Sequence, residues 1–252
     1  MKKFVILISA AVFAFSSCIF DVFGEVGNGV TVKKTIEVGA FTAISVPHST
    51  DVYYTQTLSD QELVLTCDEN LVDYYNITVE NGVLIVCMQP GVSVRTKVRS
   101  YLTVNSPALE YIKLSGSGDV HVGSPIVAAG DFEVRASGSG DLESRYGVEC
   151  RNFSARTSGS GDISVGGVTA ASAEFKSSGS GDLESGAVTA ESVSVVLTGS
   201  GDCDLVCRNA GLVSVKLSGS GDCTLSGTAR TLGNLSITGS GKLDTNRLSV
   251  GQ

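Results

Sequence analysis

The 252-residue sequence contains no tryptophan, only two histidines and only four prolines. Without tryptophan and with few other aromatics, a core must be built mainly from Val, Leu, Ile and Ala. His48 and His121 are the only histidines, and each is read as a surface polar residue rather than a catalytic base. No nucleophile elbow, His-Glu-x-x-His motif or phosphate loop occurs. The formal charge of −8 argues against nucleic acid or an anionic membrane surface as a partner.

The first residues are typical of an export signal. Lys2 and Lys3 precede an apolar run over 4–15, which is too short to span a bilayer comfortably. Small residues then lead to Cys18, as in a bacterial lipobox, although Phe15 stands where Leu is commonest. We predict a signal peptide over 1–17, a lipidated Cys18 as the mature N-terminus and a linker over 18–29. The alternative is an ordinary signal peptide in which Cys18 is incidental.

A five-residue motif, Ser/Thr-Gly-Ser-Gly-Asp, repeats along the second half of the chain. Its last position is Asp in six copies and Lys242 in a seventh, with spacings of 22, 21, 20, 20, 20 and 20 residues. So constant a period indicates a solenoid. The six aspartates are Asp119, Asp141, Asp162, Asp182, Asp202 and Asp222.

The residues between the motifs alternate between apolar and polar. Val193, Val195 and Leu197 precede one motif, and the residue after each Asp forms a further apolar column. Alternation of period two indicates strands with one buried face. The fold class predicted is all-β: a right-handed parallel β-helix with coils of about 20 residues over 111–252. Glycine is expected to permit the tight bend at each corner.

Residues 30–110 are predicted to form less regular β coils. Alternating strands are expected at 41–46, 51–55 and 62–66, and Asn81-Gly82 lies between 75–79 and 83–86, as in a hairpin. The larger side chains of this region are expected to close one end of the solenoid. The final coil has no such cover, so we expect it to pair with another chain, with a homo-oligomer as one form.

The Asp column admits two interpretations. Carboxylates stacked about 4.8 Å apart repel by about 0.9 kcal/mol in water. In the structural interpretation, each Asp accepts hydrogen bonds from backbone N–H groups of its own corner. In the functional one, Ca²⁺ bridges the column, although the period differs from that of calcium-binding nonapeptide repeats. We favour the structural interpretation and expect no cofactor.

Six cysteines remain besides Cys18. Cys203 and Cys223 share one repeat position in successive coils, so a disulfide or two buried thiols are both open, and the thiols are favoured. The remaining four show no metal spacing: Cys67, Cys87, Cys150 and Cys207.

Three segments together resemble a known family. They are Phe41-Thr-Ala-Ile-Ser-Val46 followed by Asp51-Val-Tyr-Tyr-Thr-Gln56, then Val79-Glu-Asn-Gly-Val-Leu-Ile85, then the serial corners from Ser115. The chain from about 30 to 252 resembles the putative auto-transporter adhesin, head GIN domain family of Bacteroidetes-type exported lipoproteins. One departure is Pro47-His-Ser-Thr50, where typical members carry Gly-rich residues. The resemblance implies a right-handed parallel β-helix and adhesion, and it assigns no functional residues.

The function expected is therefore that of a non-enzymatic exported protein of the cell envelope, bound to the outer membrane by its lipid. Its faces would bind a glycan or a protein. A polysaccharide-active enzyme is the first rival, because two carboxylates about 5 Å apart suit a retaining glycosidase. Six equivalent aspartates, however, supply no unique pair. A purely structural, anchored spacer is the second rival.

Overall fold

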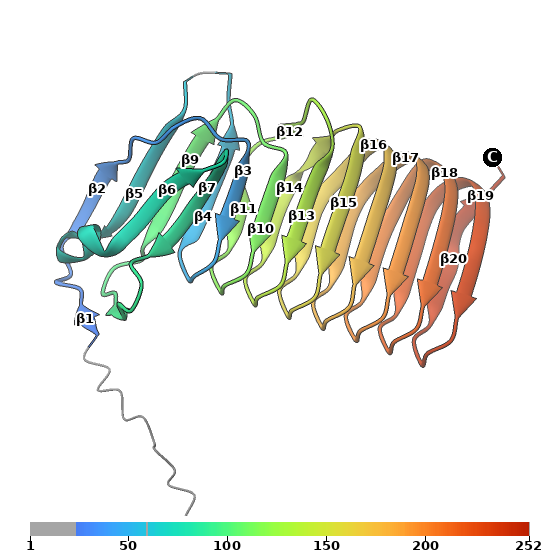
Figure 1. Ribbon diagram of the computed structural model, residues 1–252. Coiled ribbons are helices and arrows are strands. Elements are labelled where there is room, and N and C mark those ends of the chain that lie inside the picture. Colours follow the sequence, from blue (N-terminus) through green and yellow to red (C-terminus); the bar gives the residue numbers. More distant parts are fainter. Residues whose placement is uncertain (1–23, 59, 252) are drawn as a thin grey trace, which may run out of the picture.

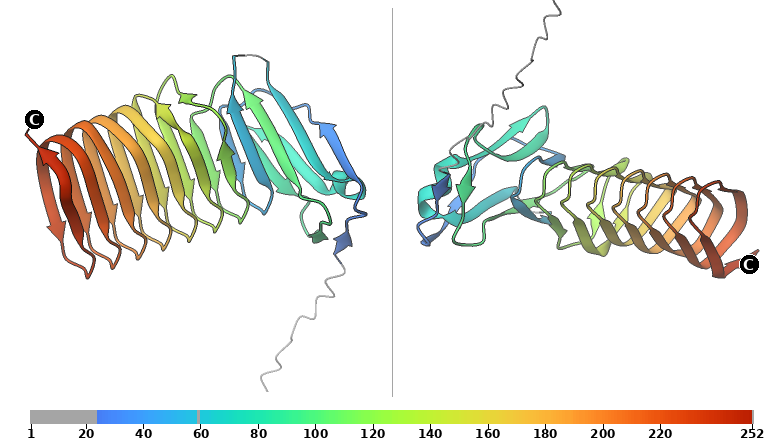
Figure 2. Two further views of the ribbon diagram at one scale, coloured as in Figure 1. Left: turned by 180° about the vertical axis from the view of Figure 1, so that it is seen from behind. Right: turned by 90° about the horizontal axis from the view of Figure 1, so that it is seen from below.

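The computed structural model describes residues 24–58 and 60–251, and this part of the chain is almost entirely β. The strands form a right-handed parallel solenoid whose coils follow one another in a row, with a mixed sheet at the N-terminal end (Figures 1 and 2). The expectation of an all-β parallel β-helix with coils of about 20 residues is confirmed.

The regular coils comprise the strands from β10 onward. The first coils are divided into short strands, whereas each coil from β16 to β19 is one 15-residue strand that bends from one face to the other. The strands are β10 (Tyr111–Leu114), β11 (Val120–Val122), β12 (Ile126–Val127), β13 (Phe132–Ala136), β14 (Leu142–Glu149), β15 (Asn152–Thr157), β16 (Ile163–Ser177), β17 (Leu183–Leu197), β18 (Cys203–Leu217), β19 (Cys223–Ile237) and β20 (Leu243–Val250).

The core consists of inward columns, one residue per coil. Val193, Val195 and Leu197 are buried, as their alternation predicts. In-register pairing also stacks the residues that follow each Asp. Phe153 lies between Phe132 and Phe175, with ring centroids 6.3 and 5.5 Å away. Burial of these columns is the main stabilising contribution, because apolar area removed from water contributes about 25 cal/mol per Å².

Glycine is required at the corners for a different reason from the one expected. They lie outside the positive-φ region, so the bend itself does not require them. A Cβ atom placed on Gly179 would instead clash with the carbonyl oxygen of Gly159 one coil earlier, and Gly181 stands in the same relation to Gly161. The corners therefore need glycine because the coils stack so closely there.

The solenoid begins earlier than residue 111. Strands β3 (Ala43–Val46) and β4 (Asp51–Gln56) pair in parallel with β10 and β11, so they form the first coil. Residues 47–51, which join these strands and include the first residue of β4, occupy the place of a Ser-Gly-Ser-Gly-Asp corner. The N–H of Ser117 donates to the His48 carbonyl. The strands beneath, β7 (Val83–Met88) and β9 (Tyr101–Ser106), pair with β3 and β4 and are joined by 89–100 instead of a five-residue corner. His48 and Thr50 can carry side chains because no such corner lies beneath theirs.

The remaining strands form the N-terminal cap. β5 pairs antiparallel with β2 and β9, and β6 and β7 form the expected hairpin, with Asn81 and Gly82 both at positive φ. The elements are β1 (Glu25–Val26), β2 (Thr31–Thr35), β5 (Glu62–Asp68), the 3-10 helix η1 (Glu69–Tyr74), β6 (Tyr75–Glu80), β7 (Val83–Met88), β8 (Val94–Arg95) and β9 (Tyr101–Ser106). Phe41 and Tyr54 are buried at this end of the core.

One buried carboxylate, Asp68, ties the cap together. It accepts hydrogen bonds from the backbone N–H groups of Gly29 (2.7 Å), Lys97 (2.9 Å) and Val98 (3.2 Å). Burial raises the pKa of Asp68, but these donors outweigh burial and hold the pKa below its ordinary value. The described end of the expected 18–29 linker is thereby part of the fold, and β1 also pairs with β8.

Candidate functional site: two charged faces beside one corner

The two strands that flank the corner carry charged columns of opposite sign. The strand that follows the corner presents the Asp column and, two residues later, a second column that includes Glu143, Glu184 and Asp204. The strand that precedes the corner presents a column of Lys and Arg. In-register stacking keeps like positions together over successive coils, so the repeat converts single charges into stripes.

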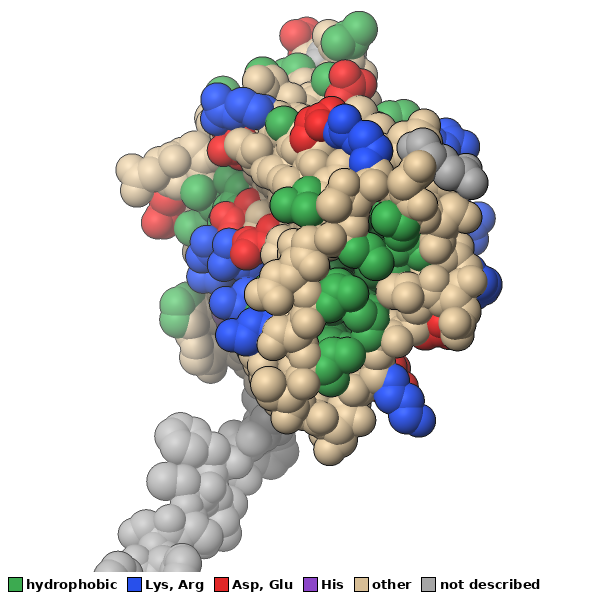
Figure 3. Space-filling model, turned by 90° about the vertical axis from the view of Figure 1, so that its right-hand side faces the viewer, with side chains coloured by type: hydrophobic (Ala, Val, Ile, Leu, Met, Phe, Trp, Pro, Cys, Tyr) green, Lys and Arg blue, Asp and Glu red, His purple; other side chains and the backbone are tan. Residues whose placement is uncertain are grey.

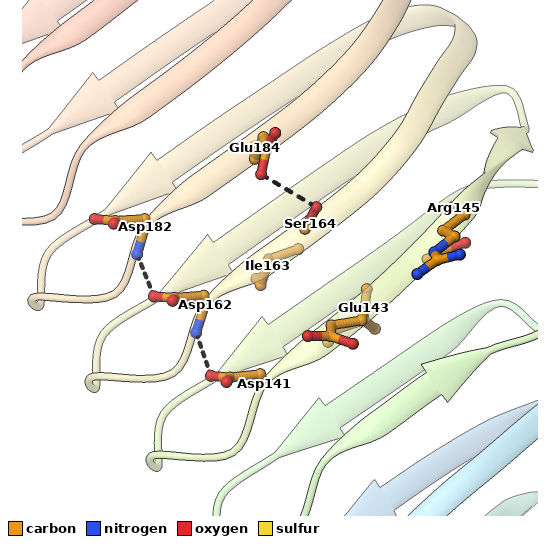
Figure 4. A pocket seen from close by; sticks show the side chains of 10 residues that line it. Asp141, Glu143, Arg145, Asp162, Ile163, Ser164, Asp182 and Glu184 are labelled. Atoms are coloured by element: carbon orange, nitrogen blue, oxygen red, sulfur yellow. Dashed lines mark hydrogen bonds between the residues drawn. The ribbon is translucent and has the colours of Figure 1, made fainter.

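The Asp column is a hydrogen-bond ladder. Oδ1 of each aspartate accepts the backbone N–H of the last corner residue in the next coil, at 2.9 Å from Asp119 to Asp141 and 2.7 Å from Asp182 to Asp202. Figure 4 shows two of these bonds. The donor is thus supplied by the neighbouring coil rather than by the Asp's own corner. The same bond recurs between the coils of Asp141, Asp162, Asp182, Asp202, Asp222 and Lys242.

The ladder has a lower end that the repeat pattern did not reveal. Asp51 accepts the N–H of Asp119 at 3.2 Å, so it is the first rung. Its other oxygen lies 3.2 Å from Nη2 of Arg99. Hydrogen bonding to Asp51 raises the pKa of Arg99. At the upper end Lys242 is bound to Asp222 through its backbone N–H. The signal by which the first rung could have been found is spacing: Asp51 stands five residues after Val46 and directly before Val52, as Asp119 stands five residues after Leu114 and directly before Val120.

His121 lies beside this first rung and is not free in solvent. Its ring stacks on Tyr53 with centroids 4.8 Å apart, and Nδ1 is 3.3 Å from Oε2 of Glu143. Nε2 is buried without a hydrogen-bond partner in the described structure. His48, in contrast, is exposed in the first corner.

The acidic face has a shallow groove of about 420 Å³. Asp141, Asp162 and Asp182 form one side, and Glu143 and Glu184 lie along it (Figure 4). The hydroxyl of Ser164 lies 3.4 Å from the Glu184 carboxylate. Over residues 24–58 and 60–251, no group of three or more His, Cys, Asp or Glu side chains is arranged to hold a metal ion.

The basic face has a second groove of about 420 Å³. Lys113, Arg135, Arg156 and Lys176 line it together with Tyr111. These four cations are about 20 residues apart in the sequence, so only the stacking of the coils brings them into one row. The signal was nonetheless present: each stands two residues before the first residue of its corner.

The six cysteines in the described structure are all free. Cys203 and Cys223 are paired in register inside the core, as their shared repeat position predicts. The pKa of Cys203 is raised well above its ordinary value, mainly by a hydrogen bond with the Cys223 side chain and also by burial. The two residues therefore act here as small apolar side chains.

The last coil leaves apolar core side chains uncovered. Figure 3 views this end of the solenoid and shows hydrophobic side chains gathered between the two faces. Leu235 is 41% exposed, Ile237 48% and Val250 44%. Leu217, which pairs in register with Ile237 one coil earlier, is buried. Cys18 and the signal segment lie outside the described residues. Among the helices of the described chain, none has the length and apolar character needed to cross a membrane.

The combination of stacked Gly-rich corners, a mixed N-terminal sheet and a β-rich first coil has counterparts among known proteins. Residues 40–210 match the family described as "Putative auto-transporter adhesin, head GIN domain". This protein belongs to that family. No curated protein matches the chain.

Solved structures of similar proteins extend the likeness over most of the chain. A putative adhesin from Bacteroides fragilis is 23% identical with a TM-score of 0.78, covering 88% of this chain and 99% of its own. A protein from Parabacteroides distasonis described as a putative lipid binding protein is 26% identical, with a TM-score of 0.69 and coverage of 87% and 98%. A putative adhesin from Parabacteroides merdae is 22% identical, with a TM-score of 0.68 and coverage of 86% and 98%. Membership in a family described as putative auto-transporter adhesins indicates an exported protein.

Proposed function

We propose that this protein is a non-enzymatic adhesin of the cell envelope, which binds a glycan or a protein through the outward faces of its solenoid. The observation that carries the proposal is the pair of charged grooves beside the corner ladder. Backbone groups within the stack are occupied by the parallel ladders, so a ligand on these faces must be recognised by side chains. Rows of identical side chains suit a repetitive or extended ligand.

The regularity of the acidic face supports binding over catalysis. A glycosidase needs two carboxylates in different environments, one acid and one base or nucleophile. Here successive aspartates share one environment, because each accepts the same N–H from the next coil. His121 and Glu143 form a pair, but the Glu143 side chain is 67% exposed and the His121 ring stacks on Tyr53.

A glycan array probed with the purified protein tests the adhesin function. We expect binding to at least one bacterial or host polysaccharide, and loss of binding after heat unfolding. No binding to any polysaccharide or surface protein would contradict the proposal. Incubation with the same polysaccharides, followed by assays for reducing ends and unsaturated sugars, tests the enzyme alternative. Release of either product would overturn the non-enzymatic function.

The anchor is part of the same proposal. Cys18 follows an apolar run and small residues, so we propose that it is lipidated and holds the protein to the outer membrane. Mass spectrometry of the mature N-terminus tests this. A diacylated Cys18 is the expected result, and a soluble product cut near Ser17 would contradict it.

A further inference from the structure

Four cations share one register position on the strands before the corner. Lys113 pairs in register with Arg135, Arg135 with Arg156, and Arg156 with Lys176. Adjacent rungs of a parallel sheet are separated by about 4.8 Å, so the row spans about 14 Å along the solenoid. The row is interrupted at Val196 and resumes at Lys216.

The groove beside this row is also lined by hydroxyl groups. They belong to Ser137, Ser158 and Ser178, the first residues of three successive corners. Tyr111 lies at the cap end, with the Arg135 guanidinium 5.9 Å from its ring centroid. The groove thus contains cations, hydroxyl groups and one aromatic face, and it runs across the strands in the direction of the stack.

Two glutamates orient the arginines without neutralising the row. Glu133 accepts hydrogen bonds from both Nε and Nη2 of Arg135, at 2.7 and 3.2 Å. Its Oε1 also lies 3.5 Å from Nε of Arg156. Arg156 also contacts Glu174. Lys113 and Lys176 have no ion-pair partner among the described residues. Four cations therefore face two carboxylates, and the strip is positive on a chain whose formal charge is −8.

The distribution of charge favours one kind of ligand. A polyanion is repelled by the acidic stripe after the corner and attracted to the basic strip before it, so the two faces steer it to one side. Ammonium and guanidinium groups bind carboxylate or sulfate, and guanidinium does so through paired donors. The strip lies on a sheet face whose backbone is paired within the stack, so a peptide could not add a strand to it.

The geometry points to a binding site for an acidic polysaccharide, bearing carboxylate or sulfate groups, along Lys113, Arg135, Arg156 and Lys176. Its chain lies parallel to the solenoid axis, with a sugar against Tyr111 and sugar hydroxyls against the corner serines. This assignment rests on the proposed adhesin function and names its ligand class.

The test uses the purified protein and two probes, heparin for sulfate groups and polygalacturonate for carboxylates, with dextran as a neutral control. Calorimetric titration at low and high salt is expected to show binding to at least one acidic probe, weakening as salt rises. Absence of binding to both acidic probes, or equal binding to dextran, would overturn the assignment.

A double variant, Lys113→Gln with Lys176→Gln, removes the two unpaired cations. We expect at least a tenfold weaker affinity with an unchanged melting temperature, because neither lysine makes an ion pair in the described structure. The control, Lys33→Gln with Lys34→Gln, removes the same charge from β2 in the cap, where Lys34 lies 3.8 Å from the exposed Asp73 carboxylate, and is expected to change affinity less than twofold. Equal weakening by both pairs would mean general charge attraction and would contradict the site.

The remaining outcomes distinguish failure of this binding site from failure of the proposed adhesin function. Binding of polyglutamate or anionic vesicles in preference to both polysaccharides would replace the ligand class and contradict the assignment. Array binding to a neutral glycan that the lysine variant leaves intact would refute this site but leave the adhesin function standing. Failure of the protein to bind any probe or array member would count against both.

Discussion

The first coil and the coils above it perform the same turn with different residues. At 47–51 the corner is Pro-His-Ser-Thr-Asp, whereas each corner from 115 onward contains two glycines. The two kinds of corner differ in what lies beneath them. An added Cβ on Gly116 would clash with the His48 carbonyl of the corner below, whereas no such corner lies beneath His48. A corner that stacks on another corner therefore needs glycine. The first coil does not, because no corner lies beneath it.

The cap and the stack also differ in how backbone N–H groups hydrogen-bond to their carboxylates. In the stack each Asp takes one N–H from the next coil and remains on the surface. In the cap Asp68 is buried and takes three N–H groups from segments distant in sequence. The stack distributes its hydrogen bonds over many equivalent positions, whereas the cap depends on one.

The largest effect on the corners is expected from Gly179→Val. Its side chain would meet backbone of the preceding corner, and we expect a loss of about 3 kcal/mol of stability, as for an overpacked core. His48→Gly, at the equivalent place in the first corner, should change stability by about 0.5–1 kcal/mol, through backbone freedom alone. Thermal and urea unfolding followed by circular dichroism measure both. Similar losses at the two positions would refute the stacking explanation.

The comparison of carboxylates is tested by pH at Asp68. Because its folded pKa lies below the unfolded value, Asp68 contributes stability above pH about 4, and this contribution is lost as pH falls through the folded pKa. Asp68→Asn should lower the melting temperature at pH 7 and flatten its dependence on acid pH. Asp60→Asn serves as the control carboxylate. An unchanged pH profile in the Asp68 variant would show that the three donors do not depend on its charge.

A smaller effect is expected in the ladder. Asp182→Ala removes the acceptor for the Asp202 N–H and should cost about 0.5–1.5 kcal/mol, whereas Asp182→Asn retains an acceptor oxygen and should cost less. Calcium addition should leave the melting temperature of the native protein unchanged. A rise in melting temperature with Ca²⁺, absent in Asp182→Ala, would favour the cation column over the ladder.

The smallest effect concerns the two ends of the stack. One end is covered by the cap, and the other exposes Ile237 and its neighbours, so we expect weak end-to-end association of two copies at high concentration. Ile237→Lys should abolish the association while leaving the monomer folded. Analytical ultracentrifugation over a concentration series measures it. A monomer at every concentration in the native chain would contradict this pairing.

Sequence patterns predicted the fold well wherever the repeat was visible. Alternation identified the buried Val193, Val195 and Leu197, and Asn81-Gly82 identified the hairpin. The first coil lies within the irregular coils predicted for 30–110, and its place in the stack was not visible because its corner lacks glycine and 68 residues separate Asp51 from Asp119. The basic groove was missed as well, since Arg135 and Arg156 look like scattered surface charges until the coils are stacked.

The period, the inward columns and the position of the corners could be read from the sequence, because these depend on residues near one another along the chain. The stacked fold was needed to show why the corner motif contains glycine, which N–H each aspartate accepts, and that the cations line one groove. Each of these depends on contacts between residues about 20 positions apart. A linear pattern gives the spacing of such residues, but only in-register stacking brings them within contact distance.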